Sequence, residues 1–177
     1  MHEYLLNFVL LIVAIIFLPL ALAGLSLAPW LPMRKKDLER INKIADLKEN
    51  QNFYELGSGD GRVCFYMAKN NPNSQIIGVE IAWPLYLYSI VKLKLLKTQN
   101  LKLIHGNVFK IPLNDADTIY FYGLTKTFNE KLLPKFKTEL KDGSKIISYV
   151  FSADNWNVKK GTDRPSTKDL PINYYIK

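Results

Sequence analysis

The 177-residue sequence predicts an α/β fold with a mostly parallel sheet, preceded by one transmembrane helix. Three observations predict this fold class. Strand-like apolar segments alternate with segments of helical spacing. A glycine-rich loop at 57–61 follows the first strand-like segment and precedes a helical one. No charged side chain lies between Glu3 and Arg34. We therefore expect a membrane anchor and linker over residues 1–33 and one domain over 34–177.

The apolar segment from Tyr4 to Ala28 is long enough, as a helix, to cross a hydrocarbon core of about 30 Å. A cleaved signal peptide is the competing interpretation, because 21–23 (ALA) resembles a cleavage site. No Lys or Arg precedes the segment, whereas basic residues follow it at 34–36. This asymmetry places the N-terminus outside and the domain in the cytoplasm. Trp30 occupies the position of an interfacial aromatic anchor.

All 24 Lys and Arg follow the apolar segment, and only one of the 16 acidic residues precedes it, so the domain carries a net charge of +9. A solvated lysine-rich surface explains this charge, and attraction to anionic lipid headgroups is the functional alternative. We expect no nucleic-acid partner, because no basic stripe is interleaved with aromatic residues. The single Cys64 excludes a disulfide scaffold. His2 and His105 are the only histidines, and we expect no metal site.

The first part of the domain reads as two strand–helix units. Asp37 is in position to cap a short amphipathic helix that runs to about Leu47. The segments that follow, in chain order, are a strand at 52–56, a helix at 63–69, a strand at 75–80 and a helix at 84–97. Asn70-Asn71-Pro72 ends the first of these helices, and Pro84 suits the first turn of the second.

The second part of the domain continues the alternation. Its expected elements are strands at 101–105 and 118–122, a helix at 129–140, and strands at 145–151 and 172–176. Residues 157–160 are expected to pair beside the last strand as a hairpin. This order predicts a mostly parallel sheet.

Three glycines at every second position, Gly57, Gly59 and Gly61, allow a tight turn and a close approach of a ligand to the backbone. A dinucleotide-binding loop has the spacing G-x-G-x-x-G, whereas this loop is G-x-G-x-G and contains Asp60. A pyrophosphate would be repelled by that carboxylate. Glu55 and Asp60 together favour a cationic ligand, and S-adenosylmethionine is the cofactor with a sulfonium and an ammonium group.

Glu80 follows Gly61 by nineteen residues and ends the second predicted strand, where its carboxylate can accept hydrogen bonds from both ribose hydroxyls. Asn107 and the backbone N–H of Val108 follow the third strand and are candidates for the adenine. The predicted cofactor-binding residues are Glu55, Gly57, Ser58, Gly59, Asp60, Gly61, Glu80, Ile81, Asn107 and Val108. The alternative is an ordinary glycine turn with a solvated acid at a strand end.

The stretch from 29 to 156 resembles the membrane-anchored class I methyltransferases, which include the mitochondrial lysine methyltransferases of the ATP synthase c-subunit and the adenine nucleotide translocase, and short prokaryotic relatives. The matching motifs are PWLP at 29–32, ELGSGDGR at 55–62, GVEIAWP at 78–84 and ELKDGSKIISYVF at 139–151. The sequence departs from the family pattern at Met33, Ala82 and 123–125. The resemblance implies a Rossmann-like seven-stranded sheet, S-adenosylmethionine as methyl donor, and a prokaryotic cell membrane as location.

The resemblance also implies that the methyl acceptor is a lysine of a membrane or membrane-associated protein. Methyl transfer depends mainly on positioning a neutral nucleophile in line with the sulfonium methyl group. Tyr122 and Thr125 are the candidate catalytic residues by position, and Trp156 is a further candidate for the acceptor pocket. Two alternatives remain: a lipid, quinone or other small hydrophobic acceptor, and a non-catalytic membrane-tethered domain.

Overall fold

The computed structural model describes residues 2, 4–11, 13, 31–154 and 156–177. Most of the predicted transmembrane segment, with the expected aromatic anchor Trp30, lies outside the described residues. Within the described part of the chain, no helix is both long and apolar enough to cross a membrane.

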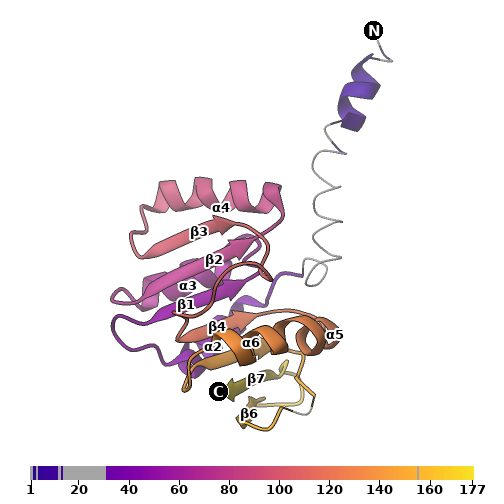
Figure 1. Cartoon of the computed structure of the whole chain (residues 1–177). Helices are drawn as coiled ribbons and strands as arrows, with labels where there is room; N and C mark the ends of the chain where they lie inside the picture. Colours follow the sequence, from indigo (N-terminus) through magenta and orange to yellow (C-terminus); the bar gives the residue numbers. More distant parts are fainter. Residues whose placement is uncertain (1, 3, 12, 14–30, 155) are drawn as a thin grey trace.

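The domain is built on a seven-stranded sheet with the strand order β3-β2-β1-β4-β5-β7-β6 (Figure 1). The strands are β1 (Asn52–Leu56), β2 (Gln75–Glu80), β3 (Leu101–His105), β4 (Thr118–Phe121), β5 (Lys145–Tyr149), β6 (Lys159–Asp163) and β7 (Ile172–Ile176). Strands β1 to β5 are parallel, whereas β7 runs antiparallel to both β5 and β6. The expected Rossmann-like sheet of seven strands is confirmed.

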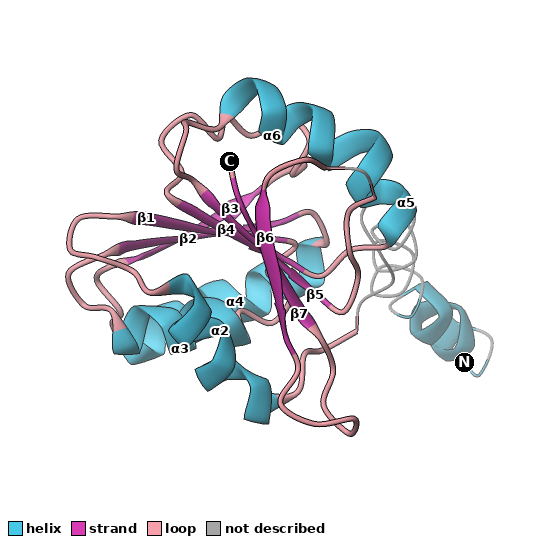
Figure 2. Ribbon diagram, turned by 90° about the horizontal axis from the view of Figure 1, so that it is seen from below, coloured by secondary structure: helices cyan, strands magenta, loops and turns pink. Residues whose placement is uncertain are grey.

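Helices cover both faces of the sheet. Their bounds are η1 (Lys35–Asp37), α2 (Leu38–Ala45), α3 (Arg62–Asn70), α4 (Trp83–Leu96), α5 (Thr125–Thr127), η2 (Phe128–Leu132) and α6 (Leu133–Glu139). Figure 2 shows α2, α3 and α4 on one face and α5 and α6 on the other. Each face has its own apolar cluster, one around Ile41, Val63 and Met67 and the other around Phe121, Phe128 and Phe136. The site therefore rests on a sheet that is packed on both faces.

The cap predicted at Asp37 is wrong, because its side chain makes no capping hydrogen bond to α2. The carboxylate is buried and accepts hydrogen bonds from the Tyr149 hydroxyl at 2.6 Å, Arg40 Nη1 at 2.8 Å and Arg34 Nε at 2.9 Å. Burial opposes ionisation, yet these donors hold the pKa of Asp37 below its usual range. Arg34 thus belongs to an internal ion pair that fixes the start of the domain.

Two predicted boundaries also differ from the structure. The helix expected at 129–140 begins earlier, at Thr125, and passes through a π-helical turn over η2 before α6. The hairpin strand expected at 157–160 is β6, shifted toward Asp163. Both differences occur in segments where the spacing of apolar residues does not determine where the element begins and ends.

Gly78 in β2 lies where the sheet and α3 pack tightly. A Cβ atom at this position would lie 2.7 Å from Cys64 Sγ and 2.8 Å from Leu103 Cδ2. We expect Gly78→Ala to reduce the free energy of unfolding by about 1–3 kcal/mol through overpacking. Thermal unfolding of the full-length chain in a mild detergent measures this. Gly106→Ala is the matched control, because its Cβ would lie no closer than 3.3 Å to any residue that is not adjacent in the chain, the nearest atom being the flexible end of Ile111. Equal losses in both variants would contradict the expectation.

Candidate functional site

The glycine-rich loop crosses the carboxyl ends of β1 and β2. Gly57, Gly59 and Gly61 have φ angles of 81°, 54° and 73°. Residues that have a Cβ atom rarely adopt this left-handed backbone conformation. The amides of Gly57 and Ser58 donate to the carbonyl of Val79 at 2.8 and 2.9 Å, which ties the loop to β2. The three glycines are therefore required by the backbone conformation of the loop.

Glu80 holds the loop from the end of β2. One carboxylate oxygen accepts a hydrogen bond from the Gly59 amide, the other accepts one from the Ala82 amide, and both distances are 2.7 Å. The residue is only 6% exposed, and burial raises the pKa of Glu80 despite these donors. Its backbone carbonyl accepts a hydrogen bond from the Gly106 amide at 3.0 Å. Glu80 thus connects the glycine loop to the segments that follow β2 and β3.

The two other acids of the site have different environments. Glu55 is buried and accepts a hydrogen bond from the Cys64 amide at 2.9 Å. Burial, together with the nearby carboxylates of Asp60 and Glu80, raises the pKa of Glu55 to about 8. Asp60 forms an ion pair with Arg62 at 2.6 Å. Burial opposes its ionisation, but the guanidinium holds the pKa of Asp60 below its usual range. Asp60 is therefore ionised at neutral pH, and its charge is balanced by Arg62.

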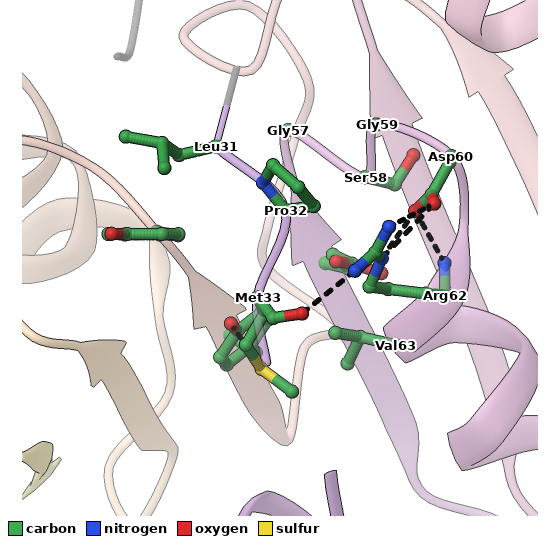
Figure 3. Close-up of a pocket in the computed structure, with 12 residues that line it drawn as sticks. Leu31, Pro32, Met33, Gly57, Ser58, Gly59, Asp60, Arg62 and Val63 are labelled. Atoms are coloured by element: carbon green, nitrogen blue, oxygen red, sulfur yellow. Dashed lines mark hydrogen bonds and ion pairs between the residues drawn. The ribbon is translucent and has the colours of Figure 1, made fainter. Parts of the chain in front are cut away.

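A small cavity of about 40 Å³ opens beside the loop (Figure 3). Its lining residues come from the segment before η1, from the loop and α3, and from the end of β4: Leu31, Pro32, Met33, Glu55, Gly57, Ser58, Gly59, Asp60, Arg62, Val63, Tyr120 and Tyr122. The cavity therefore brings the predicted cofactor loop together with Tyr122, one of the two predicted catalytic residues.

Six of the residues that line this cavity were missed by sequence reasoning: Leu31, Pro32, Met33, Arg62, Val63 and Tyr120. Arg62 Nη1 donates to the Met33 carbonyl at 2.8 Å, and the Tyr120 hydroxyl donates to Met33 Sδ at 3.1 Å. These contacts seat residues 31–33 over the loop. The only sequence signals were the position of Arg62 beside Asp60 and the departure of Met33 from the family pattern.

The remaining predicted cofactor residues follow β2 and β3 and do not line this cavity. The Ile81 carbonyl lies 3.0 Å from His105 Nε2. Asn107 Oδ1 accepts a hydrogen bond from the Phe109 amide at 2.9 Å, and the Val108 side chain is buried in the core. All three stand at the same sheet edge as Glu80, because Glu80 and His105 are register partners in β2 and β3.

Of the three residues predicted for the acceptor side, only Tyr122 lines the cavity. The ring of Tyr122 packs edge-on against Tyr149 with a centroid distance of 5.0 Å. Thr125 starts α5 outside the cavity lining, and its carbonyl accepts a hydrogen bond from Asn129. Trp156 is buried and stacked on Tyr175 at 5.4 Å, so it packs in the core.

The residues at this edge fit S-adenosylmethionine. The left-handed glycines leave the loop backbone open to a ligand, and the carboxyl groups of Glu55 and Asp60 line the cavity beside them as hydrogen-bond acceptors. The hydroxyl of Ser58 is buried beside the cavity and has no hydrogen-bond partner within the described ranges. Buried polar groups normally have partners, so this hydroxyl is available to a ligand.

The fold and this loop define a class I methyltransferase that uses S-adenosylmethionine. Residues 55–160 match the family model of the ANTKMT methyltransferase domain, and the chain belongs to this family. The RNA methyltransferase from Salinibacter ruber, solved with S-adenosyl-L-homocysteine, superposes with a TM-score of 0.75 at 22% identity, covering 82% of this chain and 93% of that one. At 22% identity, this similarity supports a shared fold and no more.

Two relatives match most of the domain. A protein-lysine N-methyltransferase of Saccharolobus islandicus is 31% identical over 133 residues, which cover 75% of this chain and 82% of the relative. The ATP synthase c-subunit lysine N-methyltransferase of Caenorhabditis elegans is 27% identical over 143 residues, covering 74% of this chain and 72% of the relative. The chain is thus an S-adenosylmethionine-dependent methyltransferase.

The raised pKa of Glu55 predicts a pH-dependent stability. An unfolded glutamate titrates near 4.5, so between that pH and about 8 the native state holds a proton that the unfolded state has lost. The stabilisation is therefore complete below pH 4.5 and is lost as the pH rises through 8, at up to about 1.4 kcal/mol per pH unit. We expect the free energy of unfolding of Glu55→Gln to rise relative to that of wild type from pH 5 to pH 8.5. A constant difference across this range, measured by denaturant titration in detergent, would contradict it.

Proposed function

We propose that this chain is a membrane-anchored protein-lysine N-methyltransferase, which methylates a lysine of a membrane or membrane-associated protein. The observation that carries the lysine assignment is the similarity to the Saccharolobus islandicus enzyme across nearly the whole domain. The named activity of the Caenorhabditis elegans relative agrees with a substrate in a membrane complex.

In this proposal, different residues around the loop contact different parts of the cofactor. The Glu80 carboxylate accepts hydrogen bonds from the ribose hydroxyls. Asn107 and the backbone amide of Val108 face the adenine. Glu55 and the loop 57–61 hold the methionine end. When bound, S-adenosylmethionine supplies an electrophilic methyl group on a cationic sulfur. The loop and the carboxyl groups beside it orient the bound cofactor, which lowers the entropic part of the barrier.

The acceptor side is assigned to the part of the cavity lined by Tyr122. A lysine ε-amine attacks only when it is neutral, and a partly dry aromatic surface favours the neutral amine. Tyr122 stands at the end of β4 and lines the same cavity as the cofactor loop. Its role is to hold the lysine side chain in line with the methyl group. Thr125 follows on the same edge, where it can contact the substrate backbone.

The anchor explains why the substrate would lie in a membrane. The uncharged segment 4–28 ends three residues before Leu31, which already lines the cavity. Three residues span about 10 Å at most. The active site is therefore held close to the bilayer surface, with the domain on the cytoplasmic side as the charge asymmetry indicates. A lysine near the membrane surface is the acceptor that this tether favours.

The test is to incubate the full-length protein with methyl-labelled S-adenosylmethionine and washed membranes, then separate protein from lipid. We expect label in a protein band, on lysine when the band is analysed by mass spectrometry. Tyr122→Ala should lose about tenfold or more of the turnover while it retains S-adenosyl-L-homocysteine binding, because only lysine positioning is removed. Tyr122→Phe, which keeps the ring, is the matched control and should retain most of the turnover.

The same experiment separates the alternatives. Label in the lipid phase would replace lysine by a lipid or quinone acceptor. Bound cofactor with no label in either phase would contradict methylation of a component of those membranes.

A further inference from the structure

The outer face of α4 carries an apolar surface that nothing in the described structure covers. Trp83, Leu87, Val91 and Leu95 recur at every fourth position and so form one stripe along the helix. We call the α4 face the set formed by this stripe and its apolar neighbours: Trp83, Leu87, Tyr88, Val91, Leu95 and Leu96. These side chains are between 42% and 76% exposed. A helix that packs on a sheet with one side normally has polar residues on the other, so this face indicates an interaction surface.

The position of α4 in the fold explains why this face is exposed among the described residues. Figure 1 shows the helix at the end of the sheet beside β3, which is the edge strand. Ser89 is the only residue of α4 that is fully buried, and its hydroxyl donates to the Gly59 carbonyl at 3.1 Å. The inner side of α4 thus supports the glycine loop, and the outer side has no counterpart among the described residues.

The charge around the α4 face has one sign. Between Glu80 and Asp115 the sequence contains no acidic residue. The same stretch contains four exposed lysines, Lys94, Lys97, Lys102 and Lys110, whereas a fifth, Lys92, lies over the Phe65 ring of α3. Exposed lysines are attracted to the anionic headgroups of a lipid surface. A second copy of the chain would bring these cations against one another, which disfavours a symmetric dimer through this face.

The dimensions and residue types fit a helix that lies in the membrane interface. The 14 residues of α4 span about 21 Å, which is too short to cross a hydrocarbon core of about 30 Å. Trp83 and Tyr88 are the aromatic types that accumulate at the headgroup level. The indole of Trp83 also packs against the ring of His105 at 4.8 Å, beside the end of β2 where Glu80 stands. The apolar face is therefore continuous with the edge that carries the cofactor loop.

We propose that the α4 face docks on the surface of an anionic lipid bilayer, with its apolar stripe in the headgroup region and its lysines on the lipid phosphates. This contact is additional to the proposed N-terminal anchor and does not depend on the methyl acceptor. Two contacts fix the orientation of the domain on the membrane, whereas a single tether leaves it free to rotate.

The test uses the full-length chain with one fluorescent label. Cys64 is completely buried, so a cysteine introduced on the surface is the accessible thiol. Val91→Cys places the label on the α4 face. Asp142→Cys is the matched control, because it lies in the exposed turn between α6 and β5, at the amino ends of the strands and opposite to the cofactor loop. Both labelled proteins are reconstituted in vesicles of phosphatidylcholine and phosphatidylserine, and retained S-adenosyl-L-homocysteine binding confirms that they are folded.

We expect aqueous iodide to quench the Val91 label about fivefold less than the Asp142 label, and a lipid-borne nitroxide to quench it more. Adding Lys94→Glu should reduce this protection. Equal iodide quenching at the two positions would overturn the proposal. Protection from iodide without quenching by the nitroxide would show that a protein surface covers α4, and disulfide cross-linking between two Val91→Cys chains would identify that surface as a second copy. Either result would overturn the bilayer assignment.

Discussion

The site depends on the buried carboxylate of Glu80. Its two oxygens accept hydrogen bonds from the amides of Gly59 and Ala82 and so join the glycine loop to the segment that leads into α4. Hydrogen bonds from amides to a carboxylate are stronger than neutral ones, and they are stronger again in a buried environment. The positive φ angles of the loop are sustained by this anchoring and by the bonds to Val79. Without Glu80, the loop would lose the contact that sets its distance from β2.

A second set of contacts seats the start of the domain against this loop. Arg62 joins Asp60 to the Met33 carbonyl, and Asp37 joins Arg40 and Tyr149 deeper in the domain. Asp37 is buried, and removing one partner of a buried ion pair costs several kcal/mol, so the pair with Arg40 specifies one arrangement. The segment that leaves the apolar N-terminal stretch is therefore fixed on the site, and this connects the proposed anchor to the catalytic cavity.

Much of the fold could be predicted from the sequence, because the apolar strands and the Gly, Pro and Asn residues between them act locally. The β1–loop–α3 unit follows from ELGSGDGR, and the strand-end position of Glu80 follows from QIIGVE. The failures have long-range causes. Asp37 looks like a helix cap in sequence, but its partner Tyr149 lies 112 residues away.

The site was predictable to the same extent. The loop glycines and Glu80 were identified from local spacing. In the structure Gly57 and Gly59 line one cavity with Tyr122, and Glu80 accepts a hydrogen bond from Gly59. Met33 and Tyr120 were not identified, because their contact joins residues 87 positions apart and neither type signals a binding role. Asp60 was interpreted as a free charge, whereas it is paired with Arg62. Sequence spacing shows which groups are near a loop, but it does not show which groups neutralise one another.

The most direct measurement is a calorimetric titration of S-adenosyl-L-homocysteine into the full-length wild type and the Glu80→Gln variant, with Glu49→Gln as a control on the exposed surface. Glutamine keeps the size of the side chain but replaces one acceptor oxygen and removes the charge. We expect Kd to rise by about tenfold to a hundredfold in Glu80→Gln and to stay unchanged in Glu49→Gln. An unchanged Kd in a folded Glu80→Gln variant would contradict the placement of the cofactor at this loop.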